Sequence, residues 1–360
     1  MGSRRAFVLG ASALASGIGA PAALAQTTVL APSPAWAQAR PETQGFPTGA
    51  LDRLFETGSL VPALRALVVV RNGRLVGERH YAGTTPDDLL PIHSATKSIV
   101  SLLVGQAVAQ GKLKSDLSQT VAELLPDLAA RFPNAAANGL TLRQILSGTT
   151  GLAYDYRLQA RALSISADPA IYAMGLEADA QPPGHWSYND AAIALLSPIL
   201  ERVQGLGLAA LAQRDLFDAL GIAHSAWQRD KTGRAFAHRG LSLRTADLAK
   251  VAWLVADGGR WNDRVVVPSR WIEDSTRAQT PGAWSIPPIG PTAYGYLWFT
   301  GRLHGTPVAW AWGYGGQFAF VAPALRLAIA TAATDPGPRE LQAQTTAMMA
   351  LVAQAVALAG

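Results

Sequence analysis

Strand-forming segments lie near both ends of this 360-residue chain, and a long helix-rich stretch separates them. Near the start, apolar β-branched runs at 63–70 and 75–81 flank Asn72-Gly73, a dipeptide that strongly favours a two-residue hairpin turn. Between about 113 and 227 the apolar pattern indicates helices and loops with little strand. A chain of this order can bury its strands well if its two ends meet in one sheet.

The last third of the chain returns to strands and ends in a helix. Its strands are predicted at 294–300, 308–312, 318–322 and 327–331, and its helix from about 339 to 358. Further helices are predicted at 48–57, 94–110 and 243–257, the last with Thr245 as its cap. We therefore predict an α+β fold in which an antiparallel sheet with terminal helices carries an inserted, mostly helical domain.

This order of elements also sets the predicted domain boundaries. The sheet domain takes residues 47–112 and 235–360, the helical domain takes residues 113–234, and the active site lies between them. The chain is long enough for two such domains with a sizeable core, and no internal repeat is found.

The first 25 residues have the features of an export signal. Arg4-Arg5 begins the segment, a mildly apolar stretch follows, and small residues ending at Ala25 offer a cleavage site. We predict a twin-arginine signal peptide over 1–25 and a Pro-rich leader arm over 26–46, with a periplasmic or secreted destination in a bacterium. The twin-arginine export machinery is then a partner during secretion. No apolar run after the signal is expected to span a membrane, so no stable membrane anchor is predicted.

Composition excludes several kinds of chemistry. The chain has no cysteine, so it has no thiolate nucleophile, no disulfide and no cysteine-ligated metal. Its six histidines are scattered without a metal-binding spacing, and we predict neither a metal nor an organic cofactor. The chain has a net charge of +5, but it contains no run of basic residues interleaved with aromatic residues. This argues against a nucleic-acid partner. The mature chain also lacks Gly-x-Ser-x-Gly, the nucleophile turn of α/β-hydrolases.

Ser94-Ala95-Thr96-Lys97 is a candidate nucleophile motif. Residues three apart share a helix face, so the Lys97 amine can lie beside the Ser94 hydroxyl. A helix N-terminus would also stabilise negative charge on an attacked carbonyl. Alternatively, Ser94 is an ordinary N-cap and Lys97 a solvated charge. The apolar surroundings of Lys97 argue against that alternative, because a buried amine without a partner is costly.

Five blocks, in order, resemble the class C-like branch of the serine β-lactamase and penicillin-binding-protein superfamily, which includes esterases and 6-aminohexanoate-dimer hydrolases. The blocks are HSATKS with LLVG (93–105), LTLRQILSGTTGL (140–152), PGHWSYND (183–190), GLSLRTADLA (240–249) and WGYGGQ (312–317). The resemblance covers roughly residues 45 to 335, and five ordered blocks are more specific than one tetrapeptide. It implies a β-lactamase/transpeptidase-like fold.

The resemblance also implies roles for individual residues. Ser94 would be the nucleophile, Lys97 its proton partner, and Tyr188 the phenol that assists as general base and acid. The sequence argument is that a nearby cation makes the loss of the phenol proton easier. The oxyanion hole would use the backbone N–H groups of Ser94 and Gln317. Without the resemblance, Tyr188 would be interpreted as an aromatic residue packed beside Trp186.

Asp190 is the first departure from the family pattern. The family motif Tyr-x-Asn is here Tyr188-Asn189-Asp190, so a carboxylate replaces an amide. An anion near Lys97 would favour the protonated amine and shift proton transfer towards Tyr188. We therefore expect Asp190 to line the substrate site, where it either pairs with Lys97 or binds a donor on the substrate.

The second departure concerns the Lys-Thr-Gly motif of β-lactamases. Lys231-Thr232-Gly233 occurs too early in the chain, in a predicted turn, and we interpret it as a coincidence. Tyr314-Gly315-Gly316 stands at the aligned position and is expected to line the substrate site. The missing cation favours neutral esters or amides over β-lactams and peptides with a carboxylate. Four tryptophans could line the site or pack in the core, with the core favoured: Trp284, Trp298, Trp310 and Trp312.

Together these observations predict a serine hydrolase of a small-molecule ester or amide, similar to carboxylesterases and amidases, that acts through an acyl-enzyme intermediate. Two alternatives stay open from the sequence. One is a weak β-lactamase or D-Ala-D-Ala peptidase, and the other is a non-catalytic paralogue that binds a ligand of the cell envelope.

Overall fold

The computed structural model describes residues 36–180 and 184–360, which lie within one compact unit. The predicted signal peptide, 1–25, and the start of the predicted leader arm lie outside the described residues. The boundary between a sheet domain and a helical domain stays a prediction.

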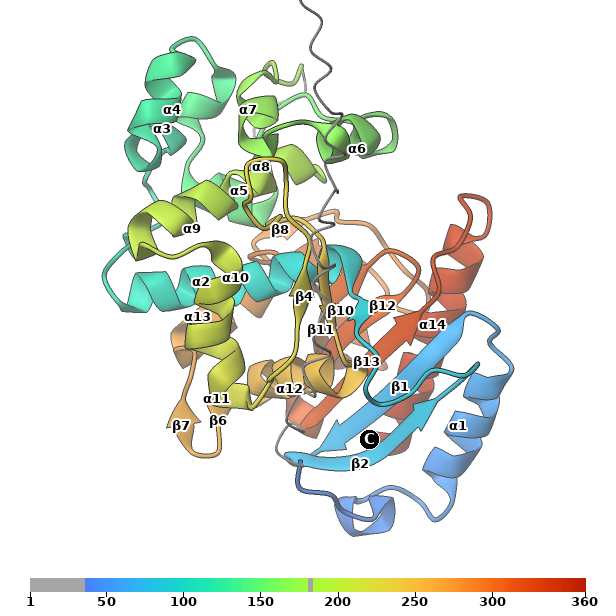
Figure 1. Cartoon of the computed structure of the whole chain (residues 1–360). Coiled ribbons are helices and arrows are strands. Elements are labelled where there is room, and N and C mark those ends of the chain that lie inside the picture. The colour runs from blue at the N-terminus through green and yellow to red at the C-terminus, as the bar shows by residue number, and fades with distance from the viewer. Residues whose placement is uncertain (1–35, 181–183) are drawn as a thin grey trace, which may run out of the picture. The chain divides into compact units, whose positions relative to one another are not determined.

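An eight-stranded antiparallel sheet is the largest sheet of the described chain (Figure 1). Its strand order is β2-β1-β13-β12-β11-β10-β9-β8. The strands are β1 (Leu64–Arg71), β2 (Arg74–His80), β8 (Thr280–Pro281), β9 (Ala293–Tyr294), β10 (Phe299–Leu303), β11 (Thr306–Gly313), β12 (Gln317–Ala322) and β13 (Leu327–Ala333). Because β1 pairs with β13, with Val69 opposite Ile329, the two ends of the chain meet in one sheet as predicted.

Helices cover the faces of this sheet. The helix α1 (Ala50–Ser59) contacts α14 (Leu341–Ala359), and both contact the sheet, whereas α12 (Thr245–Ala256) packs against β1, β12 and β13. Figure 1 shows α12 on the other side of the strands from α1 and α14. Almost every residue of β12 and β13 is buried, as expected for strands that are covered on both faces.

The helix α14 corrects one expectation from the sequence. By length and composition alone, this helix could cross a membrane. From the sequence, no apolar run after the signal peptide was expected to be long enough for that. Its apolar character comes from the alanines and other apolar residues of one continuous helix. In the structure its buried residues include Met348, Val352 and Val356, which belong to the core beside the sheet. A core helix of this kind satisfies the same criteria as a membrane span.

The hairpin between β1 and β2 confirms the signal of Asn72-Gly73. Both residues have positive φ angles, 51° and 75°, which a type I′ turn requires and which Asn and Gly tolerate best. The end of the predicted leader arm is attached here, since Trp36 Nε1 donates to the Gly73 carbonyl at 3.0 Å. Leu75 also exchanges backbone hydrogen bonds with Ala37 and Ala39.

The strand predicted at 294–300 is wrong as one element, because it is interrupted after Tyr294. Tyr296 N–H donates to the Ser275 carbonyl, and Leu297 N–H donates to the Leu146 carbonyl. Leu297 has a φ of 62°, so the backbone turns away from the sheet before β10 begins at Phe299. Such long-range partners leave no mark in the local apolar pattern.

The middle of the chain is helical, as predicted. Its helices are α3 (Val121–Leu124), α4 (Pro126–Arg131), α5 (Leu142–Ser147), α6 (Tyr156–Ile165), α7 (Pro169–Met174), α8 (Asp190–Ala194), α9 (Leu196–Gln204), α10 (Leu208–Ala212) and α11 (Asp218–Leu220). A small sheet of β3 (Leu90–Pro91), β5 (Leu241–Leu243) and β4 (Ala226–Trp227) lies beside them. The predicted cap Thr245 is wrong: Arg244 is the N-cap of α12, and the buried Thr245 hydroxyl has no hydrogen bond.

Candidate active site

Ser94 lies in a one-turn 3₁₀ helix, His93–Ala95, directly before the long helix α2 (Thr96–Ala109). Two hydrogen bonds fix this entry: Ile92 N–H donates to the Leu241 carbonyl of β5, and Thr96 Oγ1 donates to the His93 carbonyl at 2.6 Å. His93 has a φ of 47°, a left-handed conformation that few non-glycine residues adopt. Backbone strain next to a candidate nucleophile is typical of functional sites.

Lys97 is buried in the first turn of α2, with only 2% of its surface exposed. Its Nζ donates to Ser94 Oγ at 2.8 Å, to Tyr188 Oη at 2.7 Å and to the His238 carbonyl at 2.7 Å. Tyr188 Oη in turn donates to Ser94 Oγ at 2.7 Å. The structure therefore brings the three predicted catalytic side chains into one triangle of mutual contacts.

Asp190 occupies one of the two positions expected for it. Its Oδ1 lies 2.8 Å from Lys97 Nζ, and both side chains are buried. Asn189 caps the same short helix by accepting from Ala192 N–H, so the first turn of α8 directs Asp190 towards Lys97. In the ammonium form, the three N–H groups of Lys97 are used by Ser94, Tyr188 and His238, and the Asp190 carboxylate balances the charge.

Burial dominates the acid–base properties of this group. Burial lowers the pKa of Lys97. The Asp190 carboxylate acts in the opposite direction and raises this pKa, whereas the charge of Arg239 lowers it further. Burial and the Asp190 charge hold the pKa of Tyr188 well above its ordinary value, although the Ser94 hydrogen bond acts in the opposite direction. The sequence argument that a cation makes Tyr188 easier to deprotonate therefore left out burial and the nearby anion. Tyr188 is a neutral phenol in this arrangement.

His238 is a residue of this group that the sequence did not single out. It is 1% exposed, and burial lowers its pKa to about 3, so its ring is neutral. Its backbone carbonyl orients Lys97, and its ring packs edge-on against Phe236. Its only sequence signal is its position two residues before the block that begins at Gly240.

Aromatic side chains surround the Tyr188 ring. Trp284 stacks on it with ring centroids 4.4 Å apart, and Tyr156 of α6 meets it edge-on at 5.3 Å. Trp284 is 40% exposed, so of the four tryptophans considered above it is the one with a large exposed surface beside the triangle. Trp298 and Trp310 are fully buried in the core.

The predicted substrate-lining turn lies at the start of β12. Gly316 N–H donates to the Gly313 carbonyl, and Gly315 has a φ of 81°, as a type II turn requires at that position. A Cβ at Gly313 would lie 2.2 Å from the Ile92 carbonyl oxygen, which shows how closely this strand end approaches the segment before Ser94. The Tyr314 ring lies 6.1 Å from that of His93.

The Gln317 side chain joins β12 to the end of β13. Its Nε2 donates to the Ala333 carbonyl at 2.8 Å, and its Oε1 accepts from the Ala333 N–H at 2.7 Å. These contacts fix the strand end that carries the Tyr314 turn. The contribution of the Ser94 and Gln317 backbone N–H groups to an oxyanion hole stays a prediction.

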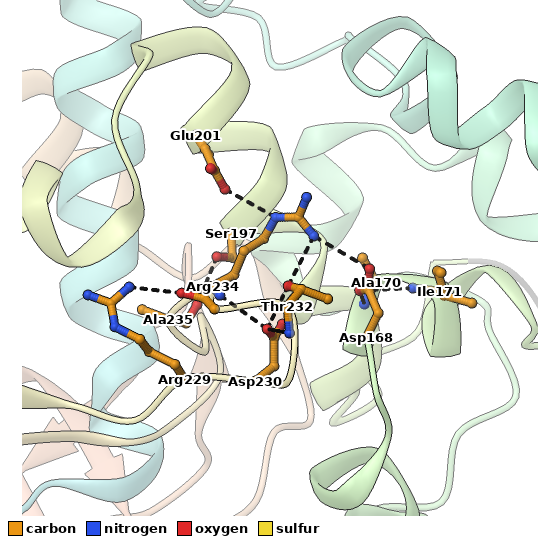
Figure 2. A network of polar contacts seen from close by, with 11 residues as sticks. Asp168, Ala170, Ile171, Ser197, Glu201, Arg229, Asp230, Thr232, Arg234 and Ala235 are labelled. Atoms are coloured by element: carbon orange, nitrogen blue, oxygen red, sulfur yellow. Dashed lines mark hydrogen bonds and ion pairs between the residues drawn. The ribbon is translucent and has the colours of Figure 1, made fainter. Parts of the chain in front are cut away.

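Lys231-Thr232-Gly233 lies in a tight surface turn held by Asp230 (Figure 2). The Asp230 carboxylate accepts from Thr232 N–H, Thr232 Oγ1 and Arg234 N–H at 2.6–3.1 Å. This turn makes no hydrogen bond to the Ser94 triangle within the described residues, which agrees with its interpretation as a coincidence. In residues 36–180 and 184–360, no group of three His, Asp or Glu side chains could hold a metal ion.

Comparisons with known proteins agree on one family. The Beta-lactamase family model matches residues 37–354. A curated relative, the 6-aminohexanoate-dimer hydrolase of Paenarthrobacter ureafaciens, is 26% identical over 276 residues, which cover 70% of this chain and 68% of the relative.

Solved structures show the same fold. A Bacillus anthracis protein, provisionally named a 6-aminohexanoate-dimer hydrolase, aligns with a TM-score of 0.72 and 19% identity over 90% of this chain and 88% of its own. A Bacteroides dorei protein, provisionally named a β-lactamase, aligns with a TM-score of 0.71 and 17% identity over 87% of this chain and 99% of its own. These similarities confirm the predicted β-lactamase/transpeptidase-like α+β fold.

Proposed function

Because the chain belongs to the beta-lactamase family, we propose that it is a serine hydrolase that cleaves a small ester or amide through an acyl-enzyme intermediate. The observation that carries this proposal is the triangle of Ser94, Lys97 and Tyr188, whose polar atoms lie 2.7–2.8 Å apart. The name of the curated relative, a 6-aminohexanoate-dimer hydrolase, supports hydrolysis as the class of reaction.

Lys97 is the base of the first step in this proposal. Its burial favours the neutral amine, and its Nζ lies 2.8 Å from Ser94 Oγ, within reach of the hydroxyl proton. As Ser94 Oγ forms a bond to the substrate carbonyl carbon, the proton moves to Lys97. The resulting ammonium is stabilised by the Asp190 carboxylate 2.8 Å away.

Tyr188 is the acid of the same step. Burial and the Asp190 charge raise its pKa, so it keeps its proton until the bond to the leaving group breaks. It then protonates the leaving oxygen or nitrogen and recovers a proton from the Lys97 ammonium at 2.7 Å. The net result is transfer of the Ser94 proton to the leaving group. In the second half, water gives a proton to the same pair as its oxygen attacks the acyl carbon. The bond from that carbon to Ser94 Oγ then breaks, the pair returns the proton to Oγ, and the acid product leaves.

The test compares the wild-type protein with Ser94→Ala and with Ser59→Ala, an exposed serine at the end of α1 that serves as the matched control. The substrates are 4-nitrophenyl butyrate, nitrocefin and a set of small amides. We expect ester or amide turnover in the wild type and the control, and a loss of at least about 10³-fold in Ser94→Ala. Intact-mass spectra should show an acyl adduct only where Ser94 is present.

The other outcomes identify the alternatives. Fast nitrocefin turnover with inert esters and amides would contradict the proposed substrate class and favour a β-lactamase. If the wild type and Ser94→Ala are equally inactive on every substrate, the proposal that the protein is an enzyme is contradicted. That result would favour a ligand-binding protein of the cell envelope.

A further inference from the structure

A groove of about 620 Å³ lies between the end of α6 and the segment that follows β4. We call it the Arg239 groove and define it by the residues that line it: Ser164, Ile165, Ser166, Gln228, Arg229, Asp230, Lys231, Phe236 and Arg239. Three of these residues are cations and one is an acid. The groove is therefore a basic and partly apolar surface.

The one acid of the groove is already engaged. Figure 2 shows the Asp230 carboxylate directed at Thr232 and at the backbone of Arg234. Arg229 also points into this turn, where its Nη1 donates to the Gly233 carbonyl at 2.8 Å. Asp230 therefore shapes the groove wall and does not pair with Arg239.

Arg239 is the half-buried cation of the groove. Its guanidinium carbon lies 4.3 Å from the centre of the buried Phe236 ring, and its Nη1 donates to Gln228 Oε1 at 3.1 Å. Its Nε is buried without a hydrogen bond, and no carboxylate forms an ion pair with it in the described part of the chain. A guanidinium held in place by stacking can bind a carboxylate in a bidentate manner through its terminal nitrogens, Nη1 and Nη2.

Two segments of the chain connect the groove with the catalytic triangle. Arg239 directly follows His238, whose carbonyl accepts from Lys97 Nζ at 2.7 Å. Tyr156, at the start of α6, packs against the Tyr188 ring, and Ser164 lies eight residues further along the same helix, about 12 Å away. A substrate that reaches from Ser94 into the groove therefore needs a chain of several atoms between its reacting carbonyl and its charged end.

We propose that the Arg239 groove binds a carboxylate carried by the substrate, so that the enzyme prefers esters or amides whose acyl chain ends in a carboxylate group. This inference rests on the proposed function, and it revises the expectation of a neutral substrate. The cation that β-lactamases carry on the strand beside the nucleophile is absent here, and Arg239, which follows His238 in the chain, supplies a cation from a different segment. Burial lowers the pKa of Arg239, whereas the charge of Asp190 raises it. The guanidinium stays charged at neutral pH.

The test uses mono-4-nitrophenyl esters of dicarboxylic acids from succinate to suberate, each paired with the neutral analogue in which a methyl ester caps the free acid. Ser94→Ala gives the background, including hydrolysis by the substrate's own carboxylate. In the wild type we expect kcat/KM for the acid to exceed that for its capped analogue about 10-fold or more at the longer chain lengths. Arg239→Gln should bring this ratio close to one.

Two further variants separate recognition from folding. Arg239→Lys keeps the charge without the planar fork and should retain part of the preference. Arg161→Gln removes an exposed cation of α6 outside the groove, and its ratio should equal that of the wild type. If Arg239→Gln does not fold, two other measurements still test the proposal. They are the dependence of the acid preference on chain length in the wild type and the ratio of kcat/KM for acid and capped analogue in Arg239→Lys.

The proposal is overturned if no acid is preferred at any chain length, or if Arg239→Gln keeps the wild-type ratio. In both cases the neutral esters are still hydrolysed, so the proposed function stands. A wild type no more active than Ser94→Ala on the neutral esters would instead contradict the proposed function itself.

Discussion

At the scale of single residues, the buried charges around Lys97 decide how protons move. Lys97 and Asp190 form an ion pair at 2.8 Å in a region where little solvent reaches either side chain. Burial favours the neutral amine, and Asp190 favours the ammonium. A base that must accept a proton and then release it is served by these opposing influences, since burial favours release of the proton and Asp190 favours its uptake.

Asp190→Asn tests this balance. Asp190 raises the pKa of Lys97, so its removal lowers that pKa, and the acidic limb of the kcat/KM profile should move to lower pH. At the plateau, kcat should fall at least about 10-fold because the ammonium formed in the first step loses its counter-charge. Ester hydrolysis measured from pH 4 to 10 gives both quantities.

The matched control is Asp52→Asn, an exposed carboxylate on α1. Its profile should superimpose on that of the wild type. Activity of Asp190→Asn within a few-fold of the wild type, with an unmoved acidic limb, would show that Asp190 serves neither Lys97 nor the substrate.

The sequence predicted part of this group. The spacing of Ser94 and Lys97 predicts a shared helix face, and the structure joins the two side chains, although Ser94 stands in a 3₁₀ turn before the helix. For Asp190 the sequence left two possible partners, Lys97 and a donor on the substrate, because either of them can form a hydrogen bond with a buried carboxylate. His238 escaped notice because it acts through its backbone carbonyl, which every residue possesses.

At the scale of elements, the close approach of β11 to the segment before Ser94 positions the turn at Tyr314. Gly313 ends β11, and a Cβ there would lie 2.2 Å from the Ile92 carbonyl oxygen and 2.7 Å from the Gln317 Cβ. The first of these neighbours is backbone, which cannot rotate away. Only glycine fits there without moving β11 or the segment before Ser94.

Gly313→Ala is therefore expected to destabilise the fold and to displace the site. We expect a loss of about 2 kcal/mol or more in the free energy of unfolding, measured by urea denaturation, together with a clear fall in kcat. Gly139→Ala is the control, since a Cβ at Gly139 meets nothing within 4 Å and the residue has no positive φ. A Gly313→Ala protein with wild-type stability and kcat would show that the strand end has room to move.

Sequence patterns located most of the elements and missed those whose hydrogen bonds are distant in the chain. The turn at Asn72-Gly73 carries its own signal, because its backbone conformation depends on those two residues. The interruption after Tyr294 depends on carbonyls of α5 and α13 (Ser269–Thr276), so a run of apolar residues conceals it.

At the scale of the whole molecule, the sheet holds the chain together without any covalent cross-link. The pairing of β1 with β13 joins residues from the two ends of the chain, and α14 closes the core beside them. The chain has no cysteine, so its fold does not depend on an oxidising compartment. Such a protein can complete its folding in the cytoplasm, as twin-arginine export requires.

This independence from disulfides leads to a prediction on export. In the full chain produced in a bacterium with a twin-arginine pathway, changing both Arg4 and Arg5 to lysine should hold the protein in the cytoplasm. Because folding needs no oxidation, the retained protein should hydrolyse 4-nitrophenyl butyrate as well as the exported one does. Activity measured in periplasmic and cytoplasmic fractions checks both statements. Unchanged periplasmic activity would contradict the twin-arginine signal, whereas retained but inactive protein would show that folding depends on export.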